Sequence, residues 1–133
     1  MKAARKTSLG RFFQELAWMS ENIDRLARLY NEGRLANRED EEDEVYLCSM
    51  RSSRARTELE FFMDETLERM KGEGHNRNLR KLFDACSSVC DDLREIDLAT
   101  SAEEVLQAAR KLKEDLRRLT ERAKRYLRVF NYS

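Results

Sequence analysis

The fold is decided by residues 79–105, which read LRKLFDACSSVCDDLREIDLATSAEEV. Up to Ile96, apolar side chains recur at alternating steps of three and four residues, the spacing of one face of an α-helix. The stretch then opens another helix, because Ser101 and Glu104 form a capping box in which Ser101 bonds forward and Glu104 reaches back. The buried face of the helix before the box is predicted to contain Leu79, Leu82, Phe83, Cys86, Val89, Cys90, Leu93 and Ile96.

The same spacing continues on both sides of this stretch. Downstream it predicts a helix from Ser101 to the region of Phe130, and upstream it predicts helices at residues 8–31 and 37–70. The predicted N-caps are Ser8, Asn37, either Asn76 or Asn78, and Ser101. Apolar core positions on the two upstream helices include Phe13, Leu16, Met19, Ile23, Tyr30, Val45, Cys48, Leu59, Phe62 and Leu67, and those on the last helix include Ala109, Leu112, Leu116, Leu119 and Tyr126.

The composition agrees with a helical protein. The chain has 133 residues, four Gly and no Pro, and 41% of its residues are hydrophobic. The scarcity of Gly and Pro argues against a β-sandwich, whose many turns need such residues. A chain of this length is typical of one domain. Amphipathic helices with short connections pack as antiparallel neighbours. We therefore predict an all-α antiparallel four-helix bundle with long second and fourth helices, forming one domain over residues 1–133 with a disordered basic N-terminus at residues 1–7.

Residue types that usually carry catalysis or bind metals are scarce. His75 is the single His, and Cys48 is expected roughly 15 Å or more along the bundle from Cys86 and Cys90, too far for a shared metal or a disulfide. We predict no enzyme activity, no catalytic residue, no metal and no cofactor. An anion site at the turn of residues 72–77 remains an alternative. Buried thiols and the lack of a long apolar run favour a cytoplasmic protein without a membrane span.

A second apolar face is predicted on the outer side of the helix at residues 37–70. Its five residues fall within about 80° of arc, opposite the predicted core face. They are Tyr46, Met50, Ser53, Thr57 and Phe61. Aromatic residues and Met are enriched where proteins meet, so this face is a candidate partner-binding site with Arg51, Arg54 and Arg56 as a polar rim. The alternatives are burial within the monomer and scattered exposed apolar residues without a role.

Basic residues form a row on one flank of the last helix. Its members share about 60° of arc with no acidic residue among them. They are Arg110, Lys113, Arg117, Lys124 and Arg128. Such a row could follow a nucleic-acid backbone, with a steep dependence of affinity on salt. The competing interpretation is that these cations pair with acids of a neighbouring helix, such as Asp84, Asp91 and Glu95.

Two functions follow as expectations. The first is a non-catalytic interaction or adaptor protein that self-associates, as a homodimer, or docks a protein partner through the Tyr46–Phe61 face. The second is a nucleic-acid backbone binder or small ribonucleoprotein subunit that uses the basic last helix. Equal numbers of basic and acidic residues, 26 of each, argue against a dedicated nucleic-acid or membrane-surface protein.

Overall fold

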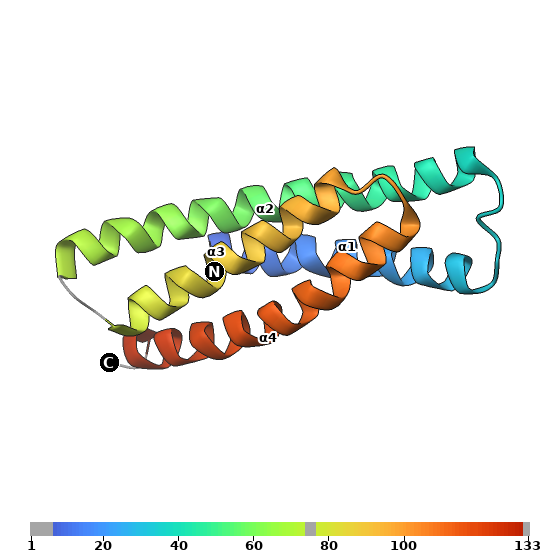
Figure 1. Ribbon diagram of the computed structural model, residues 1–133. Helices are drawn as coiled ribbons and strands as arrows, with labels where there is room; N and C mark the ends of the chain where they lie inside the picture. The colour runs from blue at the N-terminus through green and yellow to red at the C-terminus, as the bar shows by residue number, and fades with distance from the viewer. Residues whose placement is uncertain (1–6, 74–76, 132–133) are drawn as a thin grey trace, which may run out of the picture.

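The protein is an antiparallel bundle of four helices (Figure 1). The computed structural model describes residues 7–73 and 77–131, and the side chains of residues 7–72 and 77–126. The helices are α1 (Ser8–Asn31), α2 (Arg38–Glu73), α3 (Arg77–Leu98) and α4 (Ala102–Asn131). The predicted fold class and the long second and fourth helices are confirmed, at 36 and 30 residues. Within the described ranges, none of the helices contains a stretch long and apolar enough to span a membrane.

Local sequence sets the helix starts largely as predicted. Asn37 accepts a hydrogen bond from the backbone N–H of Glu39 at 2.9 Å, and Ser101 accepts one from that of Glu104 at 3.2 Å. The first cap differs, because Thr7 rather than Ser8 caps α1, accepting from the N–H of Gly10 at 3.0 Å.

Two helix boundaries differ from the prediction. Ser8 is the first residue of α1 and is buried, where its hydroxyl donates a hydrogen bond to Glu65 at 2.6 Å. That contact lies between α1 and α2, so tertiary packing gives Ser8 a use other than capping. The second difference is at the end of α2, which continues three residues past Met70 to Glu73. Of the two predicted caps for α3, Asn78 lies inside the helix, and Asn76 falls outside the described residues.

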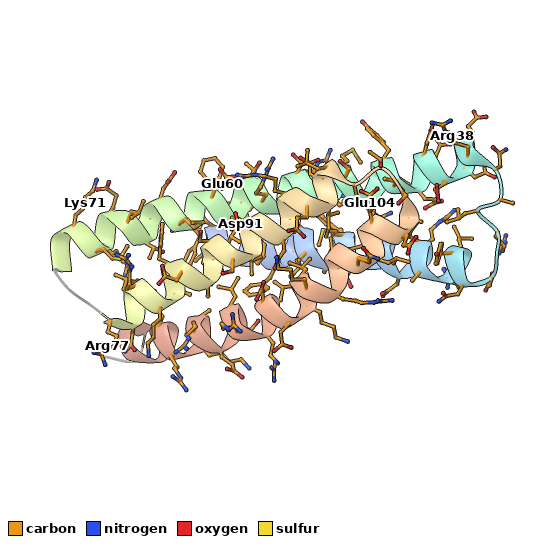
Figure 2. The ribbon with its side chains drawn as sticks, viewed as in Figure 1. Arg38, Glu60, Lys71, Arg77, Asp91 and Glu104 are labelled. Carbon is orange, nitrogen blue, oxygen red and sulfur yellow. The ribbon has the colours of Figure 1, made fainter. Side chains whose placement is uncertain are left out.

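Three of the four lateral helix pairs are closely packed. In chain order, α1 packs on α2, α2 on α3 and α3 on α4, whereas α1 and α4 make few contacts with each other. Figure 1 shows the reason in part: the hairpin of α1 and α2 is shifted along the bundle relative to that of α3 and α4. Helix α2 runs most of the length of the molecule, with Arg38 near one end and Lys71 near the other (Figure 2).

The core lies around α3. Its buried residues include Leu79, Leu82, Val89, Leu93 and Ile96, all fully enclosed. The predicted apolar rows supply most of the remaining core, but some members are not buried. Tyr30 and Leu67, predicted in the core, are exposed. Phe13, Leu16 and Ile23 of α1 are only partly buried.

Polar contacts tie the closely packed pairs together. Arg11 and Arg25 of α1 form ion pairs with Glu58 and Glu44 of α2, at 2.8 and 3.0 Å. Between α2 and α3, the buried Ser52 hydroxyl donates to the carbonyl of Leu93 at 2.5 Å. These contacts hold α2 in a defined register against both of its neighbours.

Candidate interaction surfaces

The Tyr46–Phe61 face, called here the stripe (Tyr46, Met50, Ser53, Thr57 and Phe61), lies on the outside of α2. Tyr46 is 65% exposed and Phe61 is 53% exposed, so neither is enclosed by the monomer. Met50 and Ser53 are half-buried, and Thr57 is exposed with its hydroxyl donating to the Ser53 carbonyl at 3.0 Å within the same helix. The structure therefore presents aromatic side chains at both ends of the stripe to solvent.

The predicted arginine rim is only partly present. Arg56 turns towards α3, where it lies 3.4 Å from Asp97. Arg51 turns towards α1 and lies over the ring of Trp18, 5.4 Å from its centroid. Arg54 is the exposed member of the three. Trp18, itself 41% exposed, thus extends the apolar surface from α2 onto α1, which the sequence did not predict because the two residues are far apart in the chain.

The basic row of α4 is exposed at its four described members. Arg117 is neutralised within its own helix by Glu114, to which it donates a hydrogen bond. Arg110, Lys113 and Lys124 have no acidic partner at ion-pair distance among the described side chains. The side chain of Arg128 lies outside that part of the structure.

The acids proposed as partners of the row pair elsewhere or stand apart from it. Asp84 lies 3.6 Å from Arg80 of its own helix, and Glu95 lies 3.5 Å from Lys111, which is not in the row. Asp91 is exposed. Within the described side chains, the row therefore keeps unpaired positive charge at Arg110, Lys113 and Lys124.

An open apolar groove of about 820 Å³ separates α1 from α4. It follows from the sparse contact between these two helices. Its walls are formed mainly by Phe13, Leu16, Ile23 and Tyr30 of α1 and by Leu106, Ala109 and Leu116 of α4. Arg110 and Lys113 lie on its α4 side, and Asp24 lies on its α1 side. This volume is within the range of small-molecule sites.

The groove could not be predicted from the sequence, because most of the residues in its walls belong to the predicted core rows. The available signal was the width of the apolar face on α1, where Phe12 and Phe13 are adjacent. Their side chains point about 100° apart on a helix, so one helix neighbour cannot cover both. In the structure Phe12 is fully buried and Phe13 lines the groove.

The cysteines are placed for packing rather than for chemistry. All three are buried, and burial raises the pKa of each thiol to about 12. A thiol with such a pKa is almost entirely protonated at neutral pH, and the thiolate is the reactive form. The Sγ atom of Cys90 lies 3.5 Å from the Sδ atom of Met63, which marks a packed α2–α3 contact. Among the described residues there is no cluster of three potential metal ligands, and His75 lies outside them.

A buried carboxyl group lies between α3 and α4. The side chain of Asp92 is 1% exposed, and its carboxyl oxygen lies 3.6 Å from Nζ of Lys111. Burial first, and then hydrogen bonding to Asp115 and the charge of that neighbour, raise the pKa of Asp92 to about 7. Burial and a neighbouring carboxyl group both disfavour the charged form, so Asp92 keeps its proton to a higher pH than an exposed Asp does.

Comparisons with known proteins did not assign the chain to a family. A scan against protein-family models, a search of curated proteins and a search of solved structures each found no match to this chain. The proposed function is therefore inferred from the surfaces described above.

Proposed function

We propose that this protein is a non-catalytic interaction module that self-associates or docks a protein partner through the stripe on α2. The observation that carries the proposal is the exposure of Tyr46 and Phe61 on a helix whose opposite face already forms the core. Large exposed aromatic side chains add little to the stability of a monomer. They are enriched at protein interfaces, where they bury much area at low entropic cost.

The surroundings of the stripe support the same proposal. Leu47 and Trp18 enlarge the exposed apolar surface, and Arg51 is held over Trp18. A patch that combines exposed aromatic residues and Met with charged residues around it has a composition typical of protein interfaces. The smallest self-assembly that the stripe could form is the homodimer expected from the sequence.

The test is the effect of Phe61→Glu on the mass of the protein in solution. Sedimentation velocity over a range of concentrations should show association of the wild type and a monomer for the variant. Because Phe61 is exposed, circular dichroism should show an unchanged fold. Leu98→Glu is a matched control, since Leu98 is 71% exposed and lies outside the stripe. A wild type that stays monomeric at the highest soluble concentration, and that retains no partner, would remove the proposal.

The alternative is nucleic-acid backbone binding by the basic row of α4. The exposed, unpaired positions of Arg110, Lys113 and Lys124 favour it. The pairing of Arg117 with Glu114 and the neutral net charge weaken it. Without aromatic side chains between the cations, the row offers phosphate contacts but no stacking platform for single strands.

A salt titration of duplex and single-stranded DNA tests the alternative. Three to four phosphate contacts would give a slope of log K against log salt of about −3. The double variant Arg117→Glu/Lys124→Glu should then bind more weakly with a shallower slope. If the wild type does not bind at about 50 mM salt, where backbone contacts are strong, α4 is not a nucleic-acid surface.

A further inference from the structure

We propose that the stripe of one copy docks into the α1–α4 groove of a second copy, so that the protein assembles head to tail. The inference rests on the proposed function, self-association through the stripe, and names the surface that receives it. The two surfaces lie on different helices of the same chain, so every copy offers both.

Shape is the first reason. The stripe is a convex ridge on a single helix, whereas the groove is a trough between two helices, and a helix laid in an apolar groove is a common mode of recognition. Residues 46–61 extend about 22 Å along α2 at 1.5 Å per residue, and the α1 wall, residues 13–31, extends about 27 Å. The ridge is therefore shorter than the α1 wall but longer than the α4 wall, residues 106–116, which extends about 15 Å.

Charge is the second reason. Both surfaces are bordered by exposed charged residues that have no ion-pair partner within the described part of the chain. Those at the stripe are Asp43, Arg54 and Asp64, and those at the groove are Asp24, Arg110 and Lys113. Each surface thus carries both signs, with acids in the majority at the stripe and cations in the majority at the groove. Glu60, labelled on α2 in Figure 2, is not one of these, because it lies 3.6 Å from Arg56 of the same helix.

Charge also disfavours the simplest competitor, a stripe packed against the same stripe of a second copy. An antiparallel match would bring Tyr46 against Phe61 of the second copy. Asp43 stands three residues before Tyr46 and Asp64 three residues after Phe61, so the same match brings Asp43 against Asp64 at both ends. Like charges placed together across an interface cost binding energy, whereas docking into the groove brings acids towards Arg110 and Lys113.

The assembly that follows is not limited to two copies. A contact between two different surfaces repeats from copy to copy and gives a closed ring or an open chain, whereas a contact between identical surfaces closes at a dimer. This difference makes the two arrangements separable by mixing variants.

The test uses two variants of the full chain, each with one surface blocked. Phe61→Glu blocks the stripe and leaves the groove intact. Ala17→Arg places a bulky cation at an exposed position lining the groove and leaves the stripe intact. By sedimentation velocity, the wild type should exceed a dimer as concentration rises, and each variant alone should be monomeric. An equimolar mixture of the two should form a dimer of one copy of each and nothing larger.

The outcomes separate this inference from the proposed function. If Phe61→Glu is monomeric but Ala17→Arg associates like the wild type, or the mixture stays monomeric, the groove is not the receiving surface and the stripe still is an interface. A wild type that is monomeric overturns this inference together with the self-association part of the proposed function. Leu98→Glu controls for added charge, and circular dichroism controls for folding. Lys113→Glu, at an exposed position, is the second groove variant and should lower the mass at a given concentration.

Discussion

Helix α4 has two flanks that differ in kind. On one flank it packs against α3, with fully buried apolar side chains, a buried Asp92 and an ion pair from Lys111. On the other flank it faces α1 across an apolar groove. Both flanks are apolar in sequence, so hydrophobicity alone does not decide which is closed. The difference shows that a bundle can close three helix seams and leave the fourth open.

Thiol reactivity should show the largest difference, between the closed packing around α3 and the open groove. Cys86 and Cys90 on α3 are buried, and their pKa values are near 12. They can therefore react with a thiol reagent only when the surrounding structure opens. A cysteine introduced in the groove by Ala17→Cys is exposed and should react, in dilute solution at pH 8, at least about 1000 times faster, because opening costs several kcal/mol. Equal rates for native and introduced thiols would mean that the α3 side is also open.

Truncation of a leucine should lower the free energy of unfolding more on the closed flank than at the groove. Leu93 is fully buried, so Leu93→Ala should lower the free energy of unfolding by about 2 to 5 kcal/mol. Leu116 is only partly buried at the groove, so Leu116→Ala should cost about 1 kcal/mol. Urea unfolding of both variants measures the difference. Similar losses would show that the α1–α4 seam closes in solution.

The pH dependence of stability should come in part from Asp92 on the closed flank. Its pKa is about 7 in the folded protein and 3.8 when free of the fold, so the folded state holds an extra proton between these values. The free energy of unfolding therefore falls as pH rises from about 4 to 7, by about 1.4 kcal/mol per pH unit at most. Above pH 7, Asp92 adds no further change with pH.

Asp92→Asn keeps a neutral donor beside Asp115 and should remove that slope. Relative to the wild type, the variant should be more stable at pH 8 by a few kcal/mol and little changed at pH 4. Urea unfolding at both pH values measures this. Asp91→Asn is the matched control at the adjacent exposed position. If Asp92→Asn and the wild type keep the same pH dependence, the proton is not held at Asp92.

The smallest expected effect concerns the α2–α3 seam, which is closed like the α3–α4 seam. Ser52→Ala removes the hydrogen bond to the carbonyl of Leu93 and should cost about 1 kcal/mol. Thr57→Ala, on the outer side of α2, removes a hydroxyl that bonds only within its own helix and should change stability by less than about 0.5 kcal/mol. Thermal unfolding of the pair would rank the inner and outer faces of α2, and a larger loss at Thr57 would contradict the assignment of faces.

Much of the fold could be predicted because its signals are local. The caps at Ser101 and Asn37 accept hydrogen bonds from backbone N–H groups within four residues, so the sequence contains both partners. Alternating apolar spacing identified the buried faces of α3 and most of α2 for the same reason. Ser8 was misassigned as a cap because its partner, Glu65, lies on another helix.

Of the candidate surfaces too, only those set by local sequence could be predicted. The stripe could be located from the sequence, because helical geometry alone places Tyr46 and Phe61 opposite the core face. The contact of Arg51 with Trp18, the burial of Asp92 and the groove could not. Asp92 stands seven residues after the buried Ala85 and thus on an inward face, but only the presence of α4 decides that the carboxyl group is enclosed.

Spacing along single chain segments was enough to predict four amphipathic helices, the N-caps at Asn37 and Ser101 and the outward direction of the stripe. The tertiary structure alone decided which apolar positions are enclosed. An apolar side chain is buried only where a second helix approaches it, and the approach of α1 to α4 depends on how two hairpins are shifted against each other. Phe12 and Phe13, adjacent in sequence, therefore lie in the core and in the groove respectively.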